Sequence, residues 1–228
     1  MTALPISVLI PTLNAAASLP ATLEAMRGQV AEIIIADGGS SDATRDTAQA
    51  SGALVISAPR GRGPQLRAAA DAATQPWLLA MHADTRPGPS WQEAAAGFIA
   101  QPENTAKAAH FRFALDDPAP EARRLEAMVA WRCRWLGLPY GDQGLLIARN
   151  FYQALGGYDP IPLMEDVALI RRIGRKRLMP LSAAFITSAE KWRRDGWYAR
   201  SARNLCCLSL WFAGVSPERI ARIYARRR

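Results

Sequence analysis

The first hundred residues alternate short apolar runs with helical patterns, and this alternation restricts the fold more than any other feature. Runs typical of buried strands cover 6–11, 32–37, 53–58 and 77–84. Helical patterns separate them at 18–26, 41–51 and 64–73. In the first helix, Ser18 is placed to cap the N-terminus and Pro20 falls in the first turn. Strands joined by helices form βαβ units, so the pattern predicts an α/β fold with a doubly wound, mostly parallel sheet flanked by helices.

The rhythm changes after residue 100. The patterns there predict a strand at 108–115, a long helix at 120–136, a short strand at 144–150 and two C-terminal helices within 194–226. No repeat and no linker interrupts the chain, so we expect one domain over 1–228, whose second half extends the sheet of the first. The expected parts are 1–100, 101–190 and a basic helical C-terminus at 191–228.

Positive charge is concentrated at the C-terminal end. The chain of 228 residues has a net charge of +8, but residues 171–228 alone hold 15 basic and 3 acidic side chains. Such a segment indicates an anionic partner, such as phosphate groups, anionic lipid or nucleic acid. An Arg-rich helical face exposed to solvent has the same composition, so both interpretations stay open here.

The cysteines and the N-terminus suggest a compartment. Cys133, Cys206 and Cys207 have no metal-ligand spacing, and an odd number with an adjacent pair argues against a disulfide framework. The start of the chain lacks the charged region of a signal peptide, and no run approaches the roughly 18 apolar residues of a membrane span. We expect a cytoplasmic protein, or one held peripherally at the inner membrane face by weak contacts of its basic C-terminal segment.

Polar loops follow each expected strand of the first half. They read "PTLN" (11–14), "DGGSSD" (37–42), "PRGRG" (59–63) and "HADT" (82–85). Ligands of open parallel sheets bind at the carboxyl ends of the strands, so four such loops in series predict a binding site. Neither a Gly-x-Gly-x-x-Gly fingerprint nor a P-loop occurs, which argues against a Rossmann dehydrogenase and a kinase-type NTPase.

Five segments together resemble glycosyltransferase family 2, whose enzymes have the GT-A fold. They are "SVLIPTLNAAASLPATL", "IIIADGGSSDAT", "AMHADTRP", "GDQGLLIARNFYQALGGYD" and "LMEDVALIRRI", and they span roughly residues 5–190. The resemblance implies a nucleotide-binding half at 1–100 and an acceptor and catalytic half at 101–190. The short form and the segments "GRGPQ" and "GDQG" further resemble a bacterial subgroup, the radical-SAM or selenodomain-associated transferases sometimes labelled arsenosugar-biosynthesis enzymes.

The resemblance implies a nucleotide-sugar site in the first half. Pro11, Thr12 and Asn14 would line the base, and Asp37 would accept a hydrogen bond from it. Arg62 and Gln65 match a segment near the ribose. The full set of implied donor-site residues is Pro11, Thr12, Asn14, Asp37, Gly38, Gly39, Ser40, Asp42, Arg62, Gln65, His82, Ala83 and Asp84.

The loop after the fourth strand departs from the family pattern. Relatives carry Asp-x-Asp there, whereas this chain has His82, Ala83 and Asp84. Asp84 keeps the position implied to bind a divalent metal, Mg²⁺ or Mn²⁺. His82 is open to three interpretations: a bond to ribose or phosphate, a metal ligand, or a residue packed at a strand end. Mg²⁺ prefers oxygen ligands, so a histidine ligand favours Mn²⁺.

The second half carries the implied acceptor site and catalytic base. Gly141, Asp142 and Gln143 match the family's acceptor-side loop, although a plain turn before a strand would look the same. Glu165 and Asp166 match its Glu-Asp motif, in which the Asp is the base and Glu165 supports it or contacts the acceptor. Acidic residues also suit a helix N-terminus, which is the structural alternative. An aspartate carboxylate is ionised at neutral pH and can take the acceptor's proton, and such a one-step displacement inverts the anomeric centre.

One further segment matches the family less well. "SAEKWRRDGW" (188–197) falls where relatives carry an Arg/Trp pair near the acceptor or the phosphates. Here Glu190 and Lys191 precede Trp192 and Arg193, so the roles of these residues are only loosely implied.

The leading interpretation is an inverting, metal-dependent glycosyltransferase with a nucleoside diphosphate sugar as donor, an unknown hydroxyl acceptor and no nucleic-acid partner. A sugar-nucleotide nucleotidyltransferase is the first alternative, but it needs a Gly-rich, cationic loop after the first strand. The loop "PTLNAAASLP" has neither glycine nor a cation. A non-catalytic module that binds anionic surfaces is the second alternative, and it leaves the acidic loops unexplained.

Overall fold

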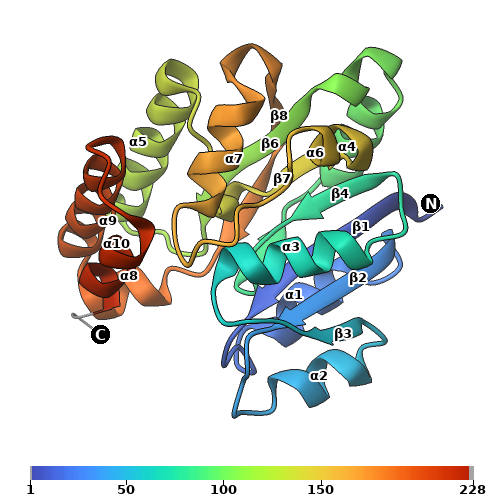
Figure 1. Ribbon diagram of the computed structural model, residues 1–228, viewed down its shortest axis with the longest axis horizontal. Helices are drawn as coiled ribbons and strands as arrows, with labels where there is room; N and C mark the ends of the chain where they lie inside the picture. Colours follow the sequence, from blue (N-terminus) through green and yellow to red (C-terminus); the bar gives the residue numbers. More distant parts are fainter. Residues whose placement is uncertain (1, 226–228) are drawn as a thin grey trace.

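One continuous sheet of eight strands organises residues 2–225, the part of the chain that the computed structural model describes (Figure 1). The strands are β1 (Leu4–Thr12), β2 (Val30–Asp37), β3 (Leu54–Ser57), β4 (Trp77–Ala80), β5 (Thr85–Pro87), β6 (Ala108–Leu115), β7 (Leu145–Ala148) and β8 (Leu178–Thr187). Their order in the sheet is β3-β2-β1-β4-β7-β6-β8-β5. The predicted α/β fold is confirmed.

Helices cover both faces of this sheet. They are α1 (Leu19–Met26), α2 (Thr44–Ala50), α3 (Arg62–Ala72), α4 (Trp91–Ile99), α5 (Pro120–Leu136), α6 (Arg149–Ala154), α7 (Glu165–Ile173), α8 (Glu190–Asp195), α9 (Trp197–Phe212) and α10 (Pro217–Ala225). Short 3₁₀ turns are η1 (Pro102–Ala106), η2 (Gly141–Gln143) and η3 (Arg175–Arg177). The two predicted C-terminal helices correspond to α9 and α10, while the predicted basic end at 226–228 lies outside the described residues.

Strand β1 shows how the sequence builds the two layers. Successive side chains of a strand point to opposite faces. Ile6, Val8 and Ile10 join the apolar cluster under α1 and α4. Leu9 joins the cluster under α3, α6 and α7. Apolar residues on both faces explain why this strand reads as a continuous hydrophobic run.

Strand β7 makes the sheet mixed rather than parallel. β3, β2, β1 and β4 pair in parallel as expected, but β7 runs antiparallel to both β4 and β6. Because β7 is reversed, the loop before it lies at the edge where its neighbours end. The 140–144 loop therefore joins the loops that follow β1, β2, β3 and β4.

Several details differ from the sequence prediction. The fourth strand stops at Ala80 instead of 84, and the second helix begins at Thr44 rather than 41. Ser18 does not cap α1 with its side chain; its hydroxyl donates to the carbonyl of Ala15 at 3.4 Å. Helix α4 and strand β8 were not predicted at all. Within the described part of the chain, every helix is too short or too polar to cross a membrane.

Candidate active site

The loops after β1 and β2 are bonded directly to each other. The N–H of Asn14 donates to Ser40 Oγ at 2.8 Å, and the N–H of Ser41 donates to Asn14 Oδ1 at 2.9 Å. The N–H of Ala16 donates to the Asp42 carboxylate at 3.1 Å. Asn14, Ser40 and Asp42, all predicted to line the nucleotide, thus hold one another in place. These hydrogen bonds fix the two loops of the predicted donor site relative to each other.

Asp37 ends β2 and is completely buried. Its carboxylate accepts hydrogen bonds from the hydroxyls of Thr12 and Ser40 and from the N–H groups of Gly39 (3.1 Å) and Ser40 (2.9 Å). Burial raises the pKa of Asp37, but these hydrogen bonds outweigh it and hold the pKa below its ordinary value. Asp37 has no exposed surface, so its predicted hydrogen bond to a nucleobase stays a prediction.

Gln65 connects the ends of β1 and β2 to the residue before α3 through hydrogen bonds of its side chain. Its Nε2 donates to the carbonyls of Thr12 (2.6 Å) and Ala36 (2.7 Å), and its Oε1 accepts the N–H of Gly61 at 3.3 Å. The side chain is buried and fully bonded within the protein. The structure therefore gives Gln65 a positioning role, and its predicted place near the ribose stays a prediction.

Arg62 connects the first half to the start of α7. Its Nε lies 2.8 Å from a Glu165 carboxylate oxygen, and Glu165 is only 1% exposed. Gly63 permits this approach, because a Cβ there would lie 2.2 Å from the carbonyl oxygen of Asp159 and 2.5 Å from that of Ile161. Burial raises the pKa of Glu165 to about 7, although Arg62 lowers it. An ion pair between the partly exposed Arg62 and the buried Glu165 thus joins the two halves.

His82 lies against the acceptor-side loop. A Cβ on Gly141 would come within 2.7 Å of His82 Nε2, so the loop passes this close only because residue 141 is glycine. Burial, and then the charges of Arg62 and Lys191, lower the pKa of His82 to about 4, against the opposing effect of Asp84. The imidazole is therefore neutral at neutral pH, the form that accepts hydrogen bonds and ligates metals.

Asp84 is ionised and already paired. Its carboxylate lies 2.6 Å from Lys191 Nζ at the start of α8, and the residues are 107 positions apart in sequence. Burial raises the pKa of Asp84, but Lys191 and His82 lower it below its ordinary value. A negative carboxylate and a neutral imidazole fit a divalent cation as two protein ligands. The described residues contain no cluster of three His, Cys, Asp or Glu side chains that could hold a metal ion.

Asp166 is held at the first turn of α7 and faces the acceptor-side loop. One carboxylate oxygen accepts the N–H of Gly141 at 3.1 Å, and the other accepts that of Val167 at 2.8 Å. Met164, just before the helix, has a φ of 70°, a strained value for a non-glycine residue. Backbone strain of this kind often occurs at functional sites, and here it lies directly before the helix turn that carries Asp166.

Asp142 and Gln143, the other predicted acceptor residues, differ in their bonding. Among the described residues, Asp142 Oδ1 is buried without a hydrogen-bond partner. Burial raises the pKa of Asp142 to about 6, although Arg132 lowers it. Gln143 is buried and donates to the Phe111 carbonyl at 3.1 Å, so it supports the loop from inside. Asp142 is the better candidate to meet a ligand.

The predicted catalytic residues therefore come together in one place. His82 and Asp84, the 141–143 turn and the Glu165–Asp166 pair act electrostatically on one another and on Arg62. Sequence reasoning missed Arg132, which stacks 3.5 Å over the Tyr140 ring, because α5 gave no sign of which arginine faces inward. A cavity of about 270 Å³ lies at the amino ends of β2 and β3, away from the predicted catalytic residues.

The fold and this site define the class: an α/β protein of the GT-A type, as the sequence indicated. A comparison with known families matches residues 7–157 to Glycosyl transferase family 2. The match covers more than half of the chain, so the chain belongs to glycosyltransferase family 2.

Curated relatives support the family over a shorter stretch. PGL/p-HBAD biosynthesis glycosyltransferases of Mycobacterium bovis and Mycobacterium tuberculosis are 38% identical over 88 residues. The match covers 34% of this chain and 34% of each relative, so the chain matches only about a third of their length.

Solved structures show the same fold. Glucosyl-3-phosphoglycerate synthase from Mycobacterium tuberculosis, in complex with Mn²⁺, UDP and glucosyl-3-phosphoglycerate, has a TM-score of 0.56 at 21% identity over 80% of this chain and 70% of that one. The same synthase with Mg²⁺ and UDP has a TM-score of 0.57 at 22% identity, covering 80% and 69%.

Proposed function

We propose that this protein transfers a sugar from a nucleoside diphosphate sugar, in the first instance a UDP-sugar, to a hydroxyl acceptor with inversion. One observation carries the proposal. The Asp166 carboxylate bonds the acceptor-side loop at Gly141, and that same loop touches His82 beside Asp84. The proposed base, Asp166, and the residues proposed to hold the metal and the diphosphate, His82 and Asp84, thus lie on the same loop contact. The family membership and the UDP complexes of the structurally similar synthase support the choice of donor.

The charges around this contact suit the departure of a diphosphate. Asp84 and His82 would hold a divalent ion, and an ion there supplies positive charge to the leaving group. Lys191 and Arg62 add fixed cations next to the same loop. Positive groups placed where negative charge develops lower the barrier to reaction. Metal dependence of this chain is part of the proposal, with Mg²⁺ or Mn²⁺ as the ion.

The chemical step uses Asp166 as a general base. The acceptor oxygen bonds the anomeric carbon while the bond from that carbon to the diphosphate oxygen breaks, through an oxocarbenium-like transition state. The acceptor's proton passes to Asp166, and the bonding electrons leave with the diphosphate. Glu165 faces Arg62 rather than the acceptor loop, so we assign it the supporting role among the two that the sequence left open.

Other predictions about partners remain proposals. The assignment to the radical-SAM or selenodomain-associated subgroup stays a prediction, and the mycobacterial relatives above carry other names. The acceptor is unassigned. Weak membrane contact through the cations of the C-terminal segment has less support than the sequence suggested. Arg200 and Arg203 are largely buried and pair with Asp195, at 2.8 and 2.7 Å.

A ligand panel tests the proposed function. Thermal unfolding is measured with UDP-, GDP- and dTDP-sugars, each with Mn²⁺ and with a chelator. A ligand at 100 times its dissociation constant stabilises by about 2.7 kcal/mol. We expect stabilisation by UDP-sugars that is larger with Mn²⁺. Failure of every nucleotide sugar to stabilise the protein contradicts the proposal. Release of pyrophosphate from UTP and a sugar 1-phosphate would instead establish the nucleotidyltransferase alternative.

A further inference from the structure

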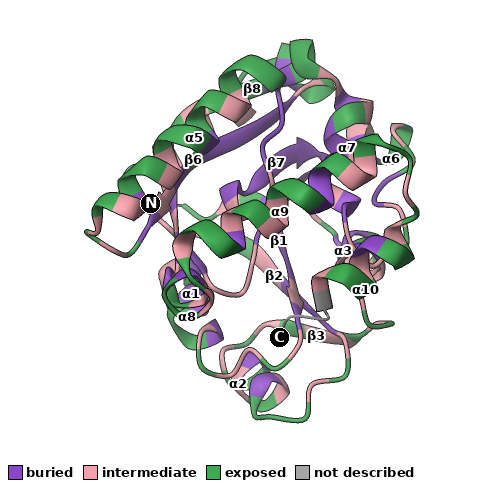
Figure 2. Cartoon of the chain, turned by 90° about the vertical axis from the view of Figure 1, so that its left-hand side faces the viewer, coloured by how far each residue is buried: buried purple, intermediate pink, exposed green. Residues whose placement is uncertain are grey.

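Exposed apolar side chains gather on two neighbouring helices, α5 and α9. Ten large apolar residues are exposed among residues 2–224, and seven of them lie on these helices. We call this set the α5–α9 surface: Met128, Trp131, Trp135, Leu136, Tyr198, Leu205 and Phe212. Both helices lie on the same side of the molecule and turn largely exposed faces toward the viewer in Figure 2. Scattered exposed apolar residues are ordinary, but a concentration of this kind marks an interaction site.

Helix α5 is apolar on two opposite sides. Its inner side buries Ala122 and Val129 against Phe113 and the Trp192 ring. Its outer side exposes Met128, Trp131 and Trp135, which are spaced three and four residues apart and so form one stripe. The two tryptophans are 56% and 55% exposed. The fold already has its core contact on the inner side, so the outer stripe does not serve the packing of this domain.

Helix α9 repeats the arrangement. Cys207 and Leu208 are buried toward α7 and α10. Tyr198, Leu205 and Phe212 follow one another at intervals of seven residues, so they line the outer face, with exposures of 70%, 63% and 50%. The two stripes are linked, because Arg124 of α5 donates to the Tyr198 hydroxyl at 3.1 Å.

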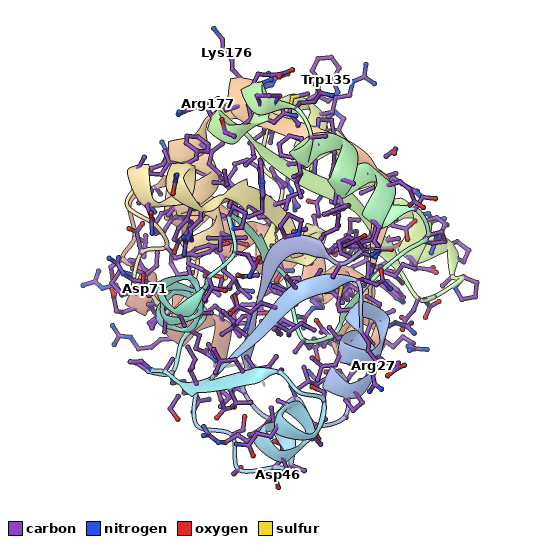
Figure 3. The ribbon with its side chains drawn as sticks, turned by 90° about the vertical axis from the view of Figure 1, so that its right-hand side faces the viewer. Arg27, Asp46, Asp71, Trp135, Lys176 and Arg177 are labelled. Carbon is purple, nitrogen blue, oxygen red and sulfur yellow. The ribbon has the colours of Figure 1, made fainter. Side chains whose placement is uncertain are left out.

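Cations surround these apolar side chains. Arg134 lies over the Trp135 ring at 5.5 Å, and Arg171 lies over the Phe212 ring at 5.3 Å. Figure 3 shows Lys176 and Arg177 extending from the same end of the molecule as Trp135. Helix α9 contains no Asp or Glu. Of the two acidic residues of α5, Glu126 is paired with Arg123 at 2.7 Å. The net charge of the surface is therefore positive.

We propose that the α5–α9 surface docks on an anionic membrane. Tryptophan and tyrosine favour the level of lipid headgroups, and neighbouring Arg and Lys attract anionic lipids. A second copy of this chain would bring the same positive charges face to face, and like charges across an interface oppose association. The cations of the C-terminal segment alone attract anionic lipid less strongly, because Arg200 and Arg203 are already paired with Asp195.

Docking in this orientation brings the acceptor-side loop near the membrane. Arg132, on the inner side of α5, donates to the Leu138 carbonyl at 2.8 Å and stacks on Tyr140, directly before the 141–143 turn. Only the thickness of one helix, about 10 Å, separates that turn from the exposed tryptophans. The inference does not depend on the proposed reaction, since membrane binding is measured on its own.

Vesicle co-sedimentation tests the docking surface. The full chain is mixed at low salt with vesicles of neutral phosphatidylcholine, or of phosphatidylcholine with 30% phosphatidylglycerol. We expect binding to the anionic vesicles only, reduced by added salt. The variants are Trp131→Ser with Trp135→Ser, and Leu205→Ser with Phe212→Ser. Each pair should lower the partition coefficient about tenfold or more, because two apolar side chains no longer enter the lipid.

A matched control separates this surface from general stickiness. Leu54→Ser removes an exposed apolar side chain from β3, distant from α5 and α9, and should leave partitioning unchanged (Figure 1). Quenching of tryptophan fluorescence by brominated lipid should fall in the Trp131/Trp135 variant. Equal binding of all variants, or no preference for anionic vesicles, overturns the proposal. Lipid-free dimerisation that the same substitutions abolish also overturns it, in favour of a contact between two copies.

Discussion

The predicted donor loops and the predicted catalytic cluster are built in opposite ways. In the donor loops, polar groups bond each other. Asp37 accepts hydrogen bonds from the N–H groups of residues 39 and 40, and Asn14, in the loop after β1, accepts one from Ser41, in the loop after β2. In the catalytic cluster, charged groups are left incompletely paired. Among the described residues, Asp142 Oδ1 and Glu165 Oε2 are buried without hydrogen-bond partners.

The donor loops are thus held by bonds among their own residues, whereas the cluster keeps carboxylate oxygens that the described residues do not bond. Satisfied polar networks make a structure rigid, whereas a buried unpaired carboxylate costs free energy that a bound cation or hydroxyl can recover. We therefore expect substitutions in the donor loops to act mainly on stability and substitutions in the cluster to act mainly on turnover and pH dependence. Four predictions test this division.

The largest effect is expected for Asp166→Asn. The amide keeps the shape of the carboxylate but cannot take a proton, so turnover should fall about 10²–10⁴-fold. Affinity for the nucleotide should stay within a few-fold, because Asp166 contacts the acceptor-side loop. Single-turnover rates and calorimetry measure the two quantities once a donor is known. Asp71→Asn, an exposed carboxylate on α3, is the control. Turnover close to that of the wild type moves the base elsewhere, with Asp142 as the next candidate.

Gln65→Ala should mainly destabilise the fold. It leaves the buried carbonyls of Thr12 and Ala36 without their donor. Unsatisfied groups of this kind cost about 1–3 kcal/mol each, so we expect the free energy of unfolding to drop by about 2–4 kcal/mol. Urea denaturation measures it, and Gln49→Ala, exposed on α2, should change stability by less than about 0.5 kcal/mol. A stable Gln65→Ala protein with lost nucleotide affinity would place Gln65 at the ligand instead.

Asp84→Ala should weaken the link between metal and donor. We expect nucleotide affinity in Mn²⁺ to fall about 10–100-fold, to the value that wild type shows in chelator, because the only carboxylate of the loop is removed. Titration calorimetry with UDP, with and without Mn²⁺, gives both values. Asp46→Ala, an exposed carboxylate on α2, controls for charge. A metal effect that survives in Asp84→Ala removes Asp84 from the ion.

The smallest effect concerns pH. Burial raises the pKa of Glu165 from 4.5 to about 7, so the folded state binds its proton more tightly than the unfolded state does. The stabilising contribution is complete below about pH 4.5 and is lost as the pH rises through 7. Relative to Glu165→Gln, the wild type should lose about 1–3 kcal/mol of unfolding free energy between pH 5 and 8. A constant difference means that Arg62 keeps Glu165 ionised throughout.

The sequence predicted the elements with strong local signals. Apolar runs located β1 to β3, and the loops after them follow from chain direction alone. The start of α7 at Glu165 matches the helix N-terminus that the sequence left open as the structural alternative for the two acidic residues. Strand β8 was missed for a physical reason: it contains Pro180. That proline is tolerated because β5 pairs only with the far end of β8, at 185–187, so Pro180 lies where the strand is an edge.

Long-range contacts explain what sequence reasoning did not predict at the site. The Asp84–Lys191 pair and the Arg62–Glu165 pair each join residues about a hundred positions apart, and no local pattern signals them. The outer stripe of α5 was hidden for another reason. A helix with apolar residues on both sides has a weak hydrophobic periodicity. The sequence alone therefore does not show which of its apolar residues face the core and which, like Trp131 and Trp135, are exposed.

The close contact of Gly63 with residues 159–161 limits how this enzyme can be redesigned. Helix α3 carries Arg62, and the 159–161 segment leads into the helix that carries Asp166. An engineer who exchanges the first hundred residues for those of a relative, to change the donor, also replaces one side of this contact. In a chimera that keeps the old 159–165 segment, a mismatch at this contact would shift Asp166, the proposed base. Under the proposed function, this contact couples the donor side to the acceptor side, and we expect an exchange to keep activity only when 159–166 is exchanged together with α3.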